Sequence, residues 1–178
     1  MAQGQASDDP AYPTGFPAAY GAGAVVNLRL FIPGKPVPQG RPKARIQGYN
    51  TPNPRPQIYE PAESRNYKEY VAEFARTQAL GIQVIGDDFV MPFTGVQCFL
   101  NLRFNMVKPP SYPKRVTVHT KRPDFDNLTK SVVDGLVNAR ILEDDGCITD
   151  STIQKRYAEP GHPEGVEVDL TVRPVETV

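Results

Sequence analysis

The residues best suited to chemistry lie in one stretch, residues 121–150, which holds seven of the twenty acidic residues of the chain. Asp124 and Asp126 stand two residues apart, Lys130 follows one helical turn later, and Asp145 comes after the same helical pattern. Mg²⁺ prefers hard oxygen ligands, and a divalent cation can polarise a phosphodiester and generate hydroxide from water. The carboxylates of Asp124 and Asp126, in an extended segment that leads into the helix, can project toward one point. Asp145 can join them only if the chain turns back. The pattern is compatible with a metal site in which Lys130 positions water or stabilises charge on a phosphate.

Each of these charged residues also has an ordinary structural interpretation. Asp126 could serve only as a helix N-cap, a position where aspartate is favoured. Residues 144–146 could form only a turn. Asp126, Lys130 and Asp134 could form a salt-bridged face exposed to solvent. Taken together, these interpretations account less well for acids at both ends of a helix next to basic loops.

The element that must position the charged residues is a helix over residues 126–140. At 100° per residue, Asp126, Lys130 and Asp134 fall on one face of this helix. The opposite face is apolar and should pack onto a sheet; it consists of Leu128, Val132, Leu136 and Ala139. Val133 and Val137 lie on the flank, where we expect a partner chain to dock.

Basic residues surround the acidic stretch in the sequence, although the formal net charge of the chain is zero. Residues 25–59 carry six basic residues and no acidic one, and residues 89–123 carry six more, again without an acid. Such stretches can form a surface that attracts phosphates, or they can be two solvated loops. The candidate phosphate-binding side chains are Lys35, Arg41, Lys43, Arg45, Lys114, Arg115, Lys121 and Arg122.

Hydrophobic periodicity predicts the remaining elements. We expect strands over residues 25–32, 94–106, 147–158 and 166–172, a helix over residues 63–80, and a short hairpin from residues 44–46 and 57–59. This order predicts an α+β fold in which two helices pack on a mixed or antiparallel sheet. Residues 25–178 should form a single domain. Residues 1–24, rich in Ala, Gly and Pro, should form a flexible arm because they cannot bury a core.

Composition excludes several classes of protein. Cys98 and Cys147 are the only cysteines and lack CxxC spacing, and His119 and His162 are isolated, so we do not expect a zinc site. Free thiols in a reducing compartment are expected instead. No apolar run is long enough to span a membrane, and the first residues lack the pattern of a signal peptide. We therefore expect a cytoplasmic protein with no membrane partner.

Residues 121–150 resemble the signature of the RusA family of Holliday-junction resolvases, found in bacteria and their prophages. The matching positions are Asp124, Asp126, Asn127, Leu128, Lys130, Asp134, Asp144, Asp145 and Ile148. The upstream loop PGKPVPQGRPKAR also resembles the early loop of the family, so the resemblance spans residues 25–173. Cys147 is a departure, because the family usually has glutamine at that position.

The resemblance implies a homodimeric, Mg²⁺-dependent endonuclease that resolves four-way DNA junctions by paired nicks in recombination and repair, with Mn²⁺ as a substitute metal. By position, Asp124, Asp126 and Asp145 match the metal-binding catalytic carboxylates of the family, and Lys130 matches its catalytic lysine. A C2 dimer would supply two sites and match the symmetry of the junction. Such a protein is expected in the cytoplasm of a bacterial or phage-infected cell.

Two alternatives stay open for the function. One is a metal nuclease that cuts flaps or other branched DNA. The other is a protein that binds branched DNA without catalysis, in which the acids are structural.

Overall fold

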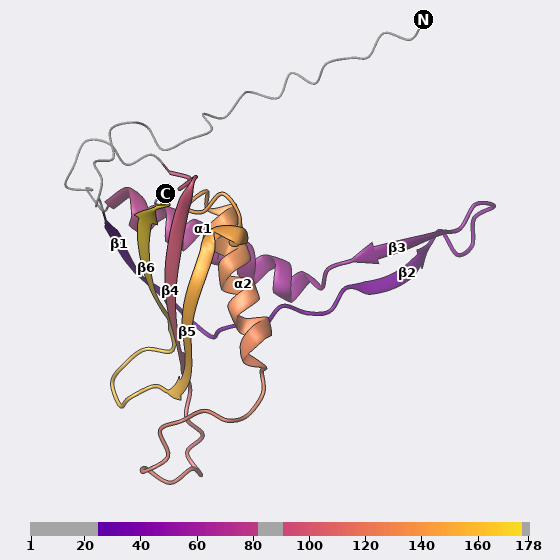
Figure 1. Cartoon of the computed structure of the whole chain (residues 1–178). Coiled ribbons are helices and arrows are strands. Elements are labelled where there is room, and N and C mark those ends of the chain that lie inside the picture. The colour runs from indigo at the N-terminus through magenta and orange to yellow at the C-terminus, as the bar shows by residue number, and fades with distance from the viewer. Residues whose placement is uncertain (1–24, 82–90, 176–178) are drawn as a thin grey trace, which may run out of the picture.

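A four-stranded mixed sheet forms one layer of the molecule, in the order β1-β6-β4-β5 (Figure 1). Its strands are β1 (Val26–Pro33), β4 (Val96–Met106), β5 (Ile148–Tyr157) and β6 (Gly165–Pro174). β6 runs antiparallel to both of its neighbours, whereas β5 lies parallel to β4 at the edge of the sheet. The computed structural model describes residues 25–81 and 91–175, so the predicted flexible arm, residues 1–24, lies outside the described residues.

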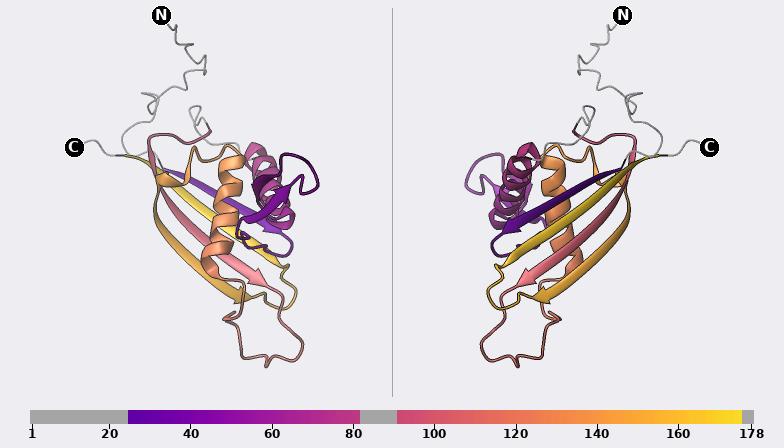
Figure 2. Two further views of the ribbon diagram at one scale, coloured as in Figure 1. Left: turned by 90° about the vertical axis from the view of Figure 1, so that its right-hand side faces the viewer. Right: turned by 90° about the vertical axis from the view of Figure 1, so that its left-hand side faces the viewer.

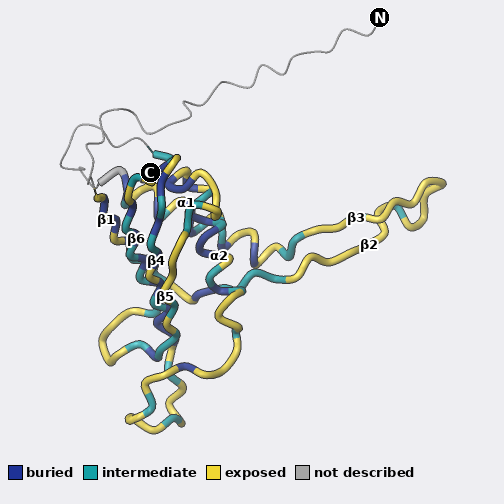
Figure 3. Tube along the Cα trace, viewed as in Figure 1, coloured by how far each residue is buried: buried dark blue, intermediate teal, exposed yellow. Residues whose placement is uncertain are grey.

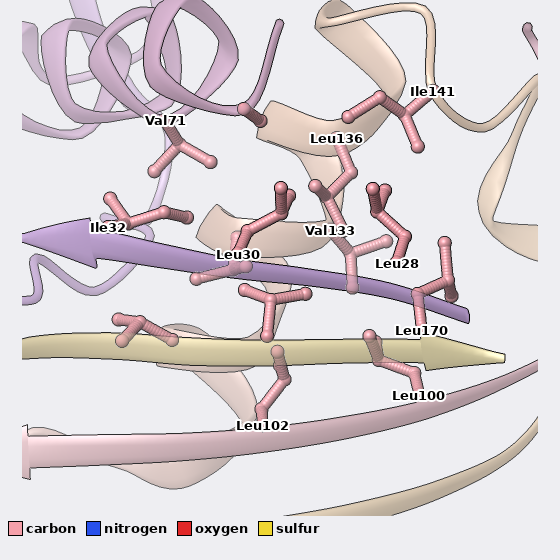
Figure 4. Close-up of a cluster of buried hydrophobic side chains, with 14 of the residues drawn as sticks. Leu28, Leu30, Ile32, Val71, Leu100, Leu102, Val133, Leu136, Ile141 and Leu170 are labelled. Atoms are coloured by element: carbon pink, nitrogen blue, oxygen red, sulfur yellow. The ribbon is translucent and has the colours of Figure 1, made fainter. Parts of the chain in front are cut away.

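Two helices, α1 (Ala62–Gly81) and α2 (Phe125–Asn138), cover one face of the sheet (Figure 2). Strand alternation turns the apolar side chains toward these helices: Leu100 and Leu102 of β4 are buried, whereas Asn101 between them is exposed on the uncovered face. Figure 4 shows side chains from both layers, Leu30 and Leu136 among them, meeting in the core. The predicted α+β fold, with two helices on a mixed sheet, is confirmed.

The two helices approach each other closely at Gly135. A Cβ atom added there would overlap the side chain of Val71 on α1 and would lie 3.3 Å from the backbone oxygen of Lys68. A glycine therefore allows α2 to pack against α1 as well as against the sheet. Val133, expected on a flank of the helix, is 6% exposed and belongs to the hydrophobic core. The expectation that it serves as an exposed docking position is wrong.

A hairpin of β2 (Lys43–Gln47) and β3 (Arg55–Tyr59) projects from the body (Figure 1). Figure 3 shows it exposed along most of its length. One face is apolar and consists of Ala44, Ile46, Pro56 and Ile58. The other face carries Lys43, Arg45, Gln47, Arg55, Gln57 and Tyr59. The hairpin predicted from the sequence is confirmed, and nothing in the described part of the chain covers either face.

Two element boundaries differ from the prediction near the acidic stretch. α2 begins at Phe125, so Asp124 and not Asp126 is its N-cap residue. A short 3-10 helix, η1 (Asp145–Cys147), precedes β5, which therefore begins at Ile148 and not at Cys147. Neither described helix is long and apolar enough to cross a membrane.

Candidate functional site

Two free carboxylates stand at the N-terminal end of α2. Asp124 occupies the N-cap position with φ −70° and ψ 144°, yet its side chain makes no capping hydrogen bond. Asp126 lies in the first turn, and both residues are exposed. Neither carboxylate forms a hydrogen bond or ion pair with a residue of the described ranges. The capping and salt-bridge interpretations therefore do not explain this pair, whose oxygens fit a hard divalent cation.

The connection from β1 to β2, residues 34–42, packs along the first two turns of α2. The backbone N–H of Gln39 donates to the carbonyl of Asn127 at 2.8 Å, and the buried Ser131 hydroxyl donates to the carbonyl of Val37 at 2.7 Å. Two of the predicted phosphate-binding side chains, Lys35 and Arg41, are exposed on this connection. The fold thus brings the first basic segment beside Asp126.

The second basic segment, residues 107–123, enters the same end of α2 from the other side (Figure 1). The ammonium group of Lys155 on β5 donates to the carbonyl of Lys121 at 2.8 Å and to that of Pro123 at 2.6 Å. The predicted phosphate-binding side chains of this segment, Lys114, Arg115, Lys121 and Arg122, are all exposed. Both basic segments therefore flank the carboxylate pair, as expected if phosphate groups lie there.

Asp145 lies at the opposite end of α2. It lines a cavity of about 210 Å³ together with Val137 and Asn138, from the last turns of the helix. The helix has 14 residues and is therefore about 21 Å long. The chain does turn back after α2, but onto the C-terminal end of the helix and not onto Asp124 and Asp126. Within the described ranges, no three His, Cys, Asp or Glu side chains gather closely enough to hold one metal ion.

The predicted carboxylate set is thus divided within one chain, with a pair at one end of α2 and a single aspartate at the other. Asp145 is exposed, and its carboxylate forms no hydrogen bond or ion pair with a described residue. Its neighbour Asp144 accepts a hydrogen bond from the backbone N–H of Gly146 at 2.6 Å. Asp144 therefore shapes the turn, and the Asp145 carboxylate stays available as a ligand.

Lys130 lies between the two ends of the helix. Its ammonium group is 3.9 Å from Asp134, a loose pair, and its side chain is 56% exposed. Asp134 is held more closely from α1, where the ammonium group of Lys68 lies 3.4 Å from its other oxygen and 2.8 Å from Glu60. Burial alone would lower the pKa of Lys68, but the bonds and charges of Glu60 and Asp134 outweigh it and raise the pKa. Asp134 therefore supports the packing of α2 on α1 and leaves Lys130 only loosely paired.

The two cysteines are free thiols, as expected from the sequence. In the fold they contact each other. The hydrogen bond between them, together with burial, raises the pKa of Cys98, and the same bond lowers the pKa of Cys147. The Cys147 thiol also donates to the carbonyl of Asp144 at 3.1 Å. Cys147 therefore holds the backbone of the turn, and its thiol forms no hydrogen bond with a carboxylate of the described residues.

Sequence reasoning missed two lysines of this region. Lys68 reads as a polar position of an ordinary helix, and Lys155 reads as one position of an alternating strand. Asp134 lies 66 residues from Lys68, and the carbonyls that Lys155 binds lie 34 and 32 residues away, so no local pattern indicates these contacts.

Exposed carboxylates flanked by basic segments fit one class of protein, the nucleases, which must bind a phosphate backbone and hydrolyse it. A family model described as endodeoxyribonuclease RusA matches residues 33–171, and the chain belongs to this family. The matched range covers α2, η1 and both basic segments, so the protein is an endodeoxyribonuclease. No curated protein matches the chain.

Proposed function

We propose that the protein is a Mg²⁺-dependent endonuclease that resolves four-way DNA junctions by paired nicks, with Mn²⁺ as a substitute metal. The observation that carries the proposal is the division of the three carboxylates between the two ends of α2. One chain offers two halves of a site, and a complete site needs a second copy of the chain. A dimer with two such sites can cut two strands of one junction, which paired incision requires.

A two-fold axis across α2 would bring Asp145 of one chain to Asp124 and Asp126 of a second chain. When two copies of the helix lie antiparallel, the N-terminal end of each meets the C-terminal end of the other. Each composite site then contains Asp124 and Asp126 of one chain and Asp145 of its partner. A homodimer has two identical sites of this kind, about one helix length apart. Val137, half-buried on the flank of α2, is available for such a contact.

The side chains of the site have separate tasks in this proposal. The three aspartates hold the cation, which when bound polarises the phosphodiester and supplies hydroxide at neutral pH. Lys130 lies on the same face of α2 and stabilises negative charge that develops on the phosphate. Its loose pairing with Asp134 leaves its ammonium group free to reach a substrate.

DNA is held mainly through its phosphates. The exposed basic side chains proposed for this role are Lys35, Arg41, Lys43, Arg45, Lys114, Arg115, Lys121 and Arg122. They lie on the hairpin and on the two segments that flank the carboxylate pair, so one DNA strand can run from the hairpin to the site. Binding through phosphates is strongly salt-dependent.

Cleavage of matched synthetic DNAs tests the proposal. With Mg²⁺, we expect the protein to cut a four-way junction in opposed strands, and a flap or linear duplex of the same sequence far more slowly. Asp126→Asn should abolish cutting and preserve junction binding, because removing a carboxylate reduces repulsion of DNA. Preferential cutting of flaps would replace the junction assignment with a flap nuclease. Junction binding without cutting under any divalent metal would make the protein a non-catalytic binding protein.

A further inference from the structure

Lys155 on β5 directs its ammonium group at backbone carbonyls and not at an acidic side chain. It lies on the helix-covered side of β5, where its register partner on β4 is the buried Phe104, and it is itself half-buried. Its ammonium group forms no ion pair with any described acid. Two of its three N–H donors are instead directed at backbone carbonyls, those of Lys121 and Pro123.

Both carbonyls belong to the segment that delivers Asp124. The Pro123 carbonyl is part of the peptide bond to Asp124, so the 2.6 Å hydrogen bond fixes the peptide plane that precedes this residue. On the other side, the backbone N–H of Leu128 donates to the carbonyl of Asp124 at 3.2 Å. The backbone of Asp124 is therefore held from both directions, by Lys155 before it and by the first helical bond after it.

The side chain of Asp124 has no such support. Its carboxylate makes no capping bond and no ion pair with a described residue, so its direction depends on the backbone that carries it. A metal site needs its ligands held within a fraction of an ångström, and groups that orient ligands are part of the site in this sense. Within the described residues, Lys155 is the side chain that orders the peptide before Asp124.

We propose that Lys155 is a positioning residue of the metal site, which acts through the backbone of Asp124 and touches neither metal nor DNA. This inference rests on the proposed function, because it assumes that Asp124 is a metal ligand. The inference also predicts the direction of the change in metal affinity, which separates a positioning role from an effect of charge. Removing a positive charge near a cation would strengthen metal binding if electrostatics dominated, whereas losing the ordered peptide weakens it.

The test measures Mn²⁺ binding to the full-length protein by calorimetry and by electron paramagnetic resonance, without DNA. We expect Lys155→Met to weaken Mn²⁺ affinity on the order of tenfold. Lys155→Arg should recover part of that loss, because a guanidinium group can also donate to both carbonyls. Lys155→Gln removes the charge and shortens the reach, so it should weaken affinity as Lys155→Met does, and it serves if Lys155→Met does not fold.

Lys108→Met is the matched control. Lys108 also donates to a backbone carbonyl of the same connection, that of Lys114 at 2.9 Å, but ten residues before Asp124. The Mn²⁺ affinity of the Lys108→Met protein should stay close to that of the parent. Hydrogen exchange gives a second readout: amides of residues 120–126 should exchange faster in Lys155→Met and not in Lys108→Met.

The outcomes are distinguishable. If the parent binds Mn²⁺ and Lys155→Met binds it equally well or more tightly, the positioning role is wrong and the proposed function stands. Equal losses in Lys155→Met and Lys108→Met would mean a general effect on the connection, which also overturns the proposal. If the parent binds no Mn²⁺ at all, the metal site itself is wrong and the inference falls with it.

Discussion

At the scale of single residues, the acids that look alike in the sequence have different surroundings in the fold. Asp144 bonds the turn and Asp134 bonds Lys68 of α1, whereas Asp124, Asp126 and Asp145 keep their oxygens free. The family resemblance separated these two groups, whereas helix geometry alone placed Asp126 and Asp134 on one face. Sequence reasoning could not find Lys155, whose role depends on a carbonyl 32 residues away.

His119, next to Lys155, predicts how stability depends on pH. The residue is 8% exposed, and its Nδ1 atom is buried without a hydrogen-bond partner among the described residues. Burial first, and the nearby charge of Lys155 second, lower its pKa in the folded protein. Between this lowered pKa and the ordinary value of about 6.5, the unfolded chain binds more protons than the folded one. The free energy of unfolding should therefore have its full value above about pH 6.5. It should decrease as the pH falls from there toward the lowered pKa of folded His119.

Urea unfolding at several pH values between 5 and 8 checks the histidine prediction. His119→Phe keeps a ring against Tyr157 and removes the titration, so its free energy of unfolding should depend less on pH than that of the parent. His162, the other histidine of the chain, is exposed and is present in both proteins. Identical pH dependences for parent and variant would show that burial of His119 does not affect its protonation.

At the scale of elements, α2 decides how the site is assembled. Its apolar face was predictable, since Leu128, Val132 and Leu136 recur at helical spacing and are all fully buried. The close approach of α1 to α2 at Gly135 was not predictable, because the two helices are far apart in the chain and no local pattern indicates their contact. The parallel pairing of β5 with β4 was not specified either, since alternation shows which face of a strand is buried but not its neighbour.

Gly135→Ala tests the close contact of the two helices. In an exposed helix this change would stabilise by about 1 kcal/mol. Here the new methyl group overlaps Val71, so we expect the free energy of unfolding to fall by about 1–3 kcal/mol. Denaturant unfolding measures the change, with Glu73→Ala on the exposed side of α1 as the control, expected within about 0.5 kcal/mol of the parent. A stabilised Gly135→Ala protein would mean that the helices are farther apart.

The β2–β3 hairpin predicts part of the salt dependence of DNA binding. Lys43 and Arg45 project from the same face, where Arg45 also lies over the ring of Tyr59. Replacing both by alanine should weaken junction binding and reduce the slope of log K against log salt by about two. Ile46→Ala, on the opposite face, should leave that slope unchanged. Titrations at several salt concentrations decide, and an unchanged slope in the double variant would place the hairpin away from DNA.

At the scale of the whole molecule, a net charge of zero hides a strongly asymmetric arrangement. The hairpin and both connections that flank the N-terminal end of α2 are basic, whereas Asp144 and Asp145 follow its C-terminal end. Two chains related by a two-fold axis would complement each other in this respect. The sequence indicated the ligands and the basic segments, but only the length of α2 in the fold showed that one chain keeps its ligands apart.

Complementation between two inactive variants tests the central claim most directly, namely that each site combines Asp126 of one chain with Asp145 of its partner. Asp126→Asn and Asp145→Asn are each prepared as homodimers, and the two chains are also co-expressed so that mixed dimers form. Each mixed dimer should contain one intact site and one site that lacks both carboxylates.

Cleavage of a synthetic four-way junction with Mg²⁺ gives the answer. We predict that each variant alone is inactive and that the co-expressed mixture regains about a quarter of the parental intact sites. Its product should be a junction nicked in one strand and not a resolved pair. A mixture as inactive as its two components, beside an active parent, would contradict the account by placing all the ligands of a site in one chain.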